Sequence, residues 1–427
     1  MPEMAKPRAK WTVLAYIAAH NNLDELGKRS LGQILDIGST PQLNLAVLYD
    51  GPASATRYIG GSPGVPDVEE PLGDFDSGDP RQLLESVRWA YERCPAERYG
   101  LVLWSHGTGW RPDEIDEVGR QARGDAAIAA TETTERAEAP GSLVLFRSTL
   151  AQLVKPESRA ERAILFDDGT GHSLDTLELG RVAGEAARLL GQPLDFLGMD
   201  ACLMATLEVA YQLRNSVRYL VASEELVPGF SWPYDQILGE LRGRPEQSAP
   251  DLATSVVRHY THYYSTNPPP AGDVTQVALD LSNVGIGAET VDELSAALLA
   301  DMESHADALW QAQFACYERE SRQRKREPNK FRFHLWDIGS LAAHLARTLS
   351  GDAVGKSAQA VVDALRSGGA VVLAEGHYGA WFDGTSGVSV YLSPPKGQRI
   401  SPYYEDLDLT KNTRWGQMIA AYHTALA

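Results

Sequence analysis

Residues 194–204 read LDFLGMDACLM, and residues 101–110 read LVLWSHGTGW. Both stretches open with an apolar run typical of a strand buried on two faces. Each run leads into a reactive side chain, Cys202 in the first and His106 in the second. Ligands of open α/β sheets bind beyond the carboxyl ends of parallel strands. If these two strands are parallel neighbours, His106 and Cys202 therefore face one crevice.

This pairing would suit acyl transfer through a thioester, with a cysteine nucleophile and a histidine general base or acid. An amphipathic helix is expected directly after Cys202, over 203–213, where its free amides would stabilise a thiolate. Each residue alone also has an ordinary interpretation. A lone buried cysteine is usually inert packing, and a lone histidine at a strand end is usually structural.

Outward from these stretches, short β-rich runs alternate with helical patterns, which predicts an α/β protein with a mostly parallel central sheet flanked by helices. The strands expected in the first half are 12–18, 45–49, 101–105, 163–166, 194–198 and 219–222, and the helices are 23–35, 80–93, 174–190 and 203–213.

The proline run 268–270 predicts a boundary between a catalytic domain, 1–267, and a C-terminal α/β extension, 271–427, that packs on or extends the core. Within the extension, the expected strands are 275–281 and 388–392, and the expected helices are 291–317, 340–349 and 353–365.

The composition of the 427 residues limits the possible partners and compartment. A formal net charge of -18 repels nucleic acid and anionic membrane surfaces. We find no apolar run long enough to span a bilayer and no leader-like start, so we expect a soluble, cytoplasmic protein. Three cysteines cannot form a disulfide framework, which suits a reducing compartment.

The motifs Ser105-His106-Gly107 and Asp200-Ala201-Cys202 resemble the clan of cysteine peptidases that includes caspases, legumains, gingipains and clostripain. The sequence is most similar to the clostripain-like family, C11. The other matching motifs are WTVLAY at 11–16, NNL at 21–23, ASEE at 222–225, WPY at 232–234, ALDL at 278–281, WDI at 336–338 and GVSVY at 387–391.

The resemblance implies a caspase-like fold and an endopeptidase that cuts protein or peptide substrates after Arg or Lys. Carried over by position, Cys202 is the nucleophile and His106 is the base or acid. The backbone N–H groups of Gly107 and Cys202 are the expected oxyanion donors.

A basic substrate side chain needs a carboxylate at the base of its pocket, because an unpaired buried cation is costly. Asp200 is the first candidate, and Glu224 and Glu225 come next, although both glutamates have a plain loop interpretation. Trp232 is the expected pocket wall.

Residues 112–162 form a long acidic insertion that is expected to be mobile, either as a solvated spacer or as a functional loop. Relatives are cut here to mature from a zymogen. The same maturation in this chain, within an intracellular bacterial proteolytic cascade, is our hypothesis, with the cut made either by Cys202 itself or by an upstream protease. The candidate cleavage positions are Arg120, Arg123, Arg136, Arg147, Arg159 and Arg162.

Two other functional interpretations remain open: a non-catalytic caspase-like scaffold that binds partners, and an acyltransferase or hydrolase acting on a small molecule. No nucleotide-binding motif is present, and we expect no cofactor or metal. Asp167 and Asp168 could hold calcium, although their spacing favours a plain turn. His20 stands where family members often carry an acidic residue, and no role is expected for it.

Overall fold

The computed structural model describes residues 8–110, 164–268, 273–321, 334–393, 400 and 402–426. The insertion 112–162 and its six candidate arginine positions lie outside these ranges. Among the described helices, none combines the length and the apolar character that crossing a bilayer would require.

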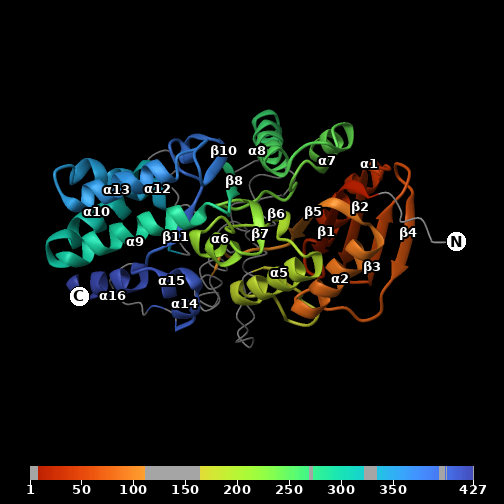
Figure 1. Cartoon of the computed structure of the whole chain (residues 1–427), viewed down its shortest axis with the longest axis horizontal. Coiled ribbons are helices and arrows are strands. Elements are labelled where there is room, and N and C mark those ends of the chain that lie inside the picture. Colours follow the sequence, from red (N-terminus) through yellow and green to blue (C-terminus); the bar gives the residue numbers. More distant parts are fainter. Residues whose placement is uncertain are drawn as a thin grey trace, which may run out of the picture.

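A nine-stranded sheet forms the centre of the molecule, in the order β10-β8-β7-β6-β5-β1-β2-β3-β4 (Figure 1). The strands are β1 (Ala9–Ala18), β2 (Leu43–Asp50), β3 (Ala55–Gly60), β4 (Pro66–Pro71), β5 (Ala96–Trp104), β6 (Leu194–Asp200), β7 (Val217–Ala222), β8 (Val274–Asp280) and β10 (Val372–Tyr378). The five central strands, β7 to β2 in sheet order, pair in parallel, whereas two strands at each edge pair antiparallel. The predicted α/β fold with its largely parallel centre is confirmed.

Helices cover both faces of this sheet (Figure 1). One side carries α1 (Asp24–Ile37), α7 (Tyr234–Gly243) and α8 (Ala249–Thr266), and the other carries α2 (Pro80–Arg93) and α5 (Thr176–Leu190) with α6 (Leu207–Leu213) packed against α5. Local sequence fixes several helix starts. In α5, for example, Asp175 and Glu178 form a reciprocal capping box, which satisfies backbone N–H groups that the helix leaves unpaired.

The chain beyond residue 273 shares the core of the first half, because β8 and β10 extend the same sheet. Its other elements are α9 (Val284–Ala300), α10 (Met302–Ser321), β9 (Leu335–Asp337), α12 (Ile338–Thr348), α13 (Ala353–Ala364), the 3-10 turn η2 (Ala380–Phe382), β11 (Ser389–Tyr391), α14 (Pro402–Asp406), α15 (Asp408–Asn412) and α16 (Trp415–Ala425). Strands β9 and β11 pair in a separate small sheet.

Buried polar contacts connect this C-terminal half to the segment after β6. The backbone N–H of Ser389 donates to the carbonyl of Ala205 at 2.9 Å. The carboxylate of Glu208, buried in α6, accepts from the backbone N–H of Tyr391 and from the hydroxyl of Tyr404, each at 2.9 Å. A buried carboxylate is stable only with such donors, so the C-terminal half fixes the position of α6.

Some sequence predictions of local structure are wrong. In place of the strand expected at 163–166, Ile164 makes isolated bridges to Gly107 and Leu174. The helix expected from residue 203 begins at Leu207, because Thr206 caps it by accepting from the backbone N–H of Val209 at 3.2 Å. The helix expected at 291–317 is two helices that break at Asp301.

Candidate active site

The register of two parallel strands brings the segments of His106 and Cys202 together. Trp104, the last residue of β5, lies opposite Asp200, the last residue of β6. His106 and Cys202 each follow these partners by two residues. The predicted parallel neighbourhood of the two strands is therefore present, and both side chains leave the same edge of the sheet.

Close backbone contact between the two segments depends on Gly107. A Cβ atom at this position would lie 2.4 Å from the carbonyl oxygen of Cys202, a distance that real Cβ atoms do not reach. On the other side of the contact, Leu203 has a φ of 65°, which is unfavourable for a branched side chain. Such strain is typical of functional sites, where surrounding structure holds it in place.

His106 is neutral and oriented by a neighbour. Burial lowers the pKa of its imidazole to about 3. Its Nε2 lies 3.0 Å from Oδ1 of Asn22, and with the amide placed this way the oxygen accepts and Nε2 carries the proton. Nδ1 is then the basic nitrogen of the ring. The ring of Phe166 lies edge-on to the imidazole, with 6.2 Å between the ring centroids.

Cys202 is a protonated thiol in this state. Only 4% of the residue is exposed, and this burial raises the thiol pKa to about 12. The nearby charge of Glu225 raises the pKa further, whereas the backbone N–H of Val227, 3.3 Å from Sγ, opposes the rise. Because α6 begins five residues later, the expected stabilisation of a thiolate by a helix N-terminus is absent.

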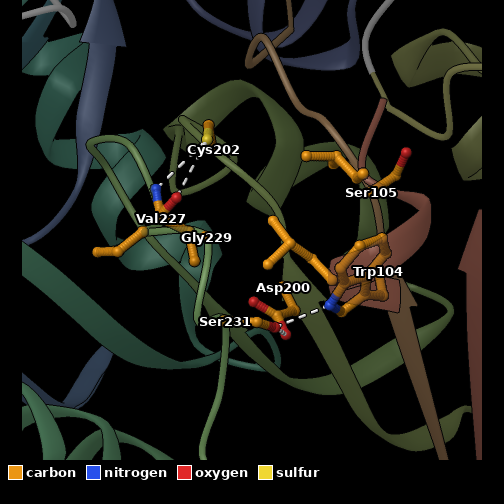
Figure 2. Close-up of a pocket in the computed structure, with 10 residues that line it drawn as sticks. Trp104, Ser105, Asp200, Cys202, Val227, Gly229 and Ser231 are labelled. Carbon is orange, nitrogen blue, oxygen red and sulfur yellow. Dashed lines mark hydrogen bonds between the residues drawn. The ribbon is translucent and has the colours of Figure 1, made fainter. Parts of the chain in front are cut away.

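Cys202 and Asp200 line the same small pocket (Figure 2). The ends of β5 and β6, the start of α1 and the loop after β7 supply its walls. The lining residues are Leu23, Leu26, Trp104, Ser105, Asp200, Cys202, Val227, Pro228, Gly229 and Ser231. A reactive sulfur and a carboxylate therefore line one cavity.

The carboxylate of Asp200 is only half satisfied. Its Oδ2 accepts from the hydroxyl of Ser231, from the hydroxyl of Tyr234 at 2.8 Å and from the backbone N–H of Trp232 at 3.2 Å. Its Oδ1 is buried and has no hydrogen-bond partner in the described structure. Burial raises the pKa of Asp200 to about 6, against the effect of its three donors. A cation entering the pocket would find an unpaired oxygen.

The other predicted binding residues lie outside the lining of this pocket. Glu224 is fully buried and accepts from the hydroxyl of Ser389 at 3.1 Å. Glu225 uses a carboxylate oxygen to accept from the backbone N–H of Leu226. Trp232 packs over β6, where its ring fills the space beside Gly198.

Sequence reasoning missed two residues that organise the site. Ser231 has a φ of 63°. Its hydroxyl donates to Asp200 and accepts from the indole N–H of Trp104 at 2.8 Å, so it links these two residues. Asn22 orients His106 from a position 84 residues away. The Asn-Asn pair at 21–22 was a visible family motif, but no spacing rule connects it to a particular histidine.

Outside the pocket, three described side chains are arranged so that they could hold a metal ion. They are His20, Asp50 and Asp167. Asp168, the other residue of the possible calcium pair, is exposed and donates its backbone N–H to the carbonyl of His20 at 2.8 Å.

Replacing Gly107 by alanine tests the backbone contact at the site. The added methyl must push the segments of His106 and Cys202 apart, so we expect a loss of about 1–3 kcal/mol in the free energy of unfolding, as for overpacking elsewhere. Urea denaturation measures it. Gly184→Ala is the matched control, since its Cβ would lie 3.6 Å from the nearest atom, on helix α5. The free energy of unfolding of that variant should rise by about 0.5–1 kcal/mol. Equal effects at both glycines would contradict the contact.

Known proteins match the chain over most of its length. The model of the clostripain family, peptidase C11, matches residues 15–126 and 143–422. Clostripain of Hathewaya histolytica is 27% identical over 177 residues, which cover 40% of this chain but only 25% of that protein. The chain thus matches a quarter of the length of this curated relative.

Two solved structures have a similar fold. A secreted C11 cysteine protease from Bacteroides thetaiotaomicron, in complex with an irreversible peptide inhibitor, superposes with a TM-score of 0.64 at 19% identity, covering 96% of this chain and 100% of the other. An inactive zymogen C11 protease from Parabacteroides distasonis superposes with a TM-score of 0.59 at 17% identity, covering 95% of this chain and 99% of the other. The fold is therefore caspase-like. Since the family model matches well over half of its residues, the chain belongs to the clostripain family of cysteine peptidases.

Proposed function

We propose that this chain is a cysteine endopeptidase that cuts peptide bonds after arginine or lysine. The observation that carries the proposal is the unpaired Oδ1 of Asp200, buried in the same pocket as the sulfur of Cys202. A guanidinium or ammonium group that entered the pocket would supply the missing donor and a compensating charge. The substrate residue that carries this side chain would then place its backbone carbonyl carbon near Cys202.

On this proposal, the reaction begins with proton transfer from the thiol of Cys202 to the basic Nδ1 of His106. The sulfur attacks the substrate carbonyl carbon, and the oxyanion that forms accepts hydrogen bonds from the backbone N–H groups of Gly107 and Cys202. The imidazolium returns its proton to the leaving amine, which leaves a thioester on Cys202. Water, deprotonated by His106, hydrolyses this thioester and releases the acid.

Asn22 acts in this scheme as a positioning residue. By accepting from Nε2 it keeps the lone pair on Nδ1, and it would stabilise the imidazolium that forms when Nδ1 takes the proton. The low pKa of the buried imidazole means that transfer from the thiol is uphill in the resting state. Charge formation therefore depends on bound substrate.

We further propose that the intact chain is a zymogen, activated by cleavage in 112–162 and acting in an intracellular bacterial cascade. The protonated thiol and neutral imidazole of the intact chain support a resting state of low reactivity. A relative described as an inactive zymogen offers a precedent within the family. Self-cleavage and cleavage by an upstream protease remain alternatives.

Asp200→Asn tests the specificity. Losing one partner of a buried ion pair costs roughly 3–5 kcal/mol, so kcat/KM for an arginyl reporter should fall on the order of 100- to 5,000-fold. For a citrulline reporter, which has nearly the same shape but no charge, kcat/KM should fall much less. In the wild type, kcat/KM for the arginyl reporter should fall as the pH drops through about 6, because Asp200 then becomes protonated and neutral. The variant should lack this dependence.

Asp195→Asn is the matched control for that experiment. Asp195 is buried at the other end of β6, where it accepts from the backbone N–H of Tyr99 at 2.9 Å. Its replacement should leave the preference for arginine over citrulline unchanged. An Asp200→Asn enzyme that keeps the wild-type preference would contradict the role of Asp200 and leave the peptidase activity itself standing.

Cys202→Ala tests which enzyme makes the activating cut. If the chain cuts itself, the purified variant should run as one intact band while the wild type yields two fragments. A trace of active wild type added to the variant should then restore cleavage at an arginine of the insertion, as mass spectrometry would locate it. An uncut wild type would contradict self-cleavage and leave an upstream protease as the activator, and two fragments from the variant in its expression host would assign the cut to another enzyme.

A further inference from the structure

A second group of chemically active side chains lies at the carboxyl end of the sheet, beside the proposed active site. His20 follows β1 by two residues, Asp50 is the last residue of β2, and Asp167 lies in the segment before α5. One ligand atom from each residue lies within 4.8 Å of the others. Nδ1 of His20 is 3.2 Å from Oδ1 of Asp167. A nitrogen and two carboxylates thus converge from three separate parts of the chain.

An unsatisfied group within the cluster indicates a missing partner. Asp50 is 2% exposed, and its Oδ2 is buried without a hydrogen-bond partner in the described structure. The hydroxyl and backbone N–H of Ser77 lie close enough to interact with Asp50, but no hydrogen bond of good geometry joins that hydroxyl to Oδ2. No described lysine or arginine forms an ion pair with Asp50 or Asp167. Two buried carboxylates near each other without a strong cation are unfavourable.

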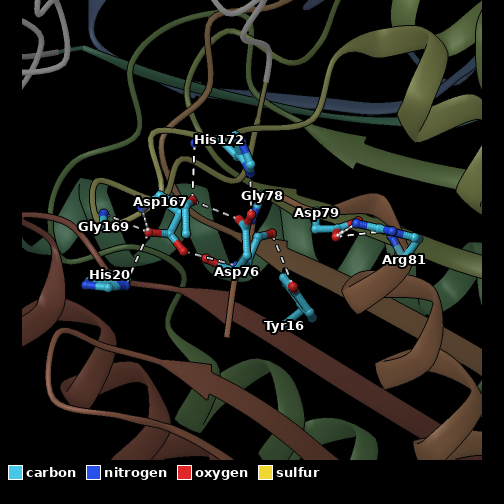
Figure 3. A network of polar contacts seen from close by, with 11 residues as sticks. Tyr16, His20, Asp76, Gly78, Asp79, Arg81, Asp167, Gly169 and His172 are labelled. Carbon is cyan, nitrogen blue, oxygen red and sulfur yellow. Dashed lines mark hydrogen bonds and ion pairs between the residues drawn. The ribbon is translucent and has the colours of Figure 1, made fainter. Parts of the chain in front are cut away.

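The carboxylate of Asp167 is already oriented by surrounding hydrogen-bond donors (Figure 3). Oδ1 of Asp167 accepts from the backbone N–H groups of Gly169 at 2.8 Å and Thr170 at 3.1 Å, and Oδ2 accepts from that of Ser77 at 3.2 Å. Hydrogen bonds of this kind fix ligating carboxylates in metal sites.

The imidazole of His20 is fixed by packing. A Cβ on Gly169 would lie 2.2 Å from the ring, so the bare glycine backbone forms the surface against which the ring lies. The side chain of His20 is 28% exposed, whereas that of Asp167 is fully buried. His20 therefore lies on the route by which an ion would enter from solvent.

We propose that His20, Asp50 and Asp167 bind one divalent transition-metal ion, of the class of Zn²⁺ or Mn²⁺. An imidazole with two carboxylates suits these ions, whereas Ca²⁺ takes six to eight oxygen ligands. The ion would replace the contact between His20 and Asp167 and would give Asp50 its missing partner. Asp168, the neighbour expected from sequence to share a calcium site, takes no part.

The position of this site connects it to His106. The side-chain amide of Asn21 donates to the carbonyl of Phe166 at 2.7 Å, and Asn22 contacts His106. An ion held by His20 and Asp167 would therefore tie together the two segments that flank the catalytic imidazole. Binding would stabilise that wall of the active site, and it does not depend on the peptidase proposal.

The test uses full-length Cys202→Ala protein, because the thiol of Cys202 with His106 could itself hold zinc. After chelator treatment and dialysis, titration with ZnCl₂ or MnCl₂ in a calorimeter should show one equivalent bound, and thermal unfolding should shift upward with ion concentration. Adding His20→Gln or Asp50→Asn to this background should weaken binding at least about 30-fold. It should also abolish the thermal shift.

His172→Gln is the matched control. His172 pairs with Asp76 in the same network but is not one of the three converging residues, so this variant should keep wild-type affinity and thermal shift. Without metal, Asp50→Asn should melt no lower than its parent, because it removes a buried unpaired charge; this separates lost binding from lost folding. Undiminished binding in both ligand variants, no binding by the parent, or binding of CaCl₂ alone would overturn the proposal.

Discussion

The parallel pairing of β5 with β6 is the constraint on which the site depends. Its register sets Trp104 opposite Asp200, and two residues further it delivers an imidazole and a thiol to the same edge of the sheet. The absence of a side chain at Gly107 allows the two backbones to touch there. A shift of one residue would turn every side chain of one strand to the opposite face and would separate the pair.

Burial determines the chemistry of the three central groups. It keeps the thiol of Cys202 protonated, the imidazole of His106 neutral and the pKa of Asp200 near 6. None of these groups is at its most reactive in the intact chain. A basic substrate side chain would pair with Asp200 and displace water from the pocket, so substrate binding and activation of the dyad are coupled on our proposal.

The sequence was informative where chemistry and periodicity coincide. Buried apolar runs located β5 and β6, and the side chains at or just after their ends identified Asp200, His106 and Cys202 as candidates. Contacts between distant segments could not be predicted: no local pattern links Asn22 to His106, Ser231 to Asp200, or His20 to Asp50 and Asp167. The helix after Cys202 was placed too early, because the apolar pattern from 203 continues through a buried turn that Thr206 ends by capping α6. The edge strand β4, polar and half exposed, lacks the buried pattern that identified the others.

Covalent labelling of the wild-type protein tests the central claim most directly. An arginyl chloromethyl ketone should alkylate Cys202 after cleavage of the insertion, as peptide mapping by mass spectrometry would show, while Cys94 stays unmodified. His106→Ala should slow this labelling sharply, and a glutamyl analogue should react far more slowly than the arginyl reagent. Labelling at Cys94 or Cys316 instead, or labelling of Cys202 at the same rate without His106, would contradict a shared site for sulfur, imidazole and basic side chain.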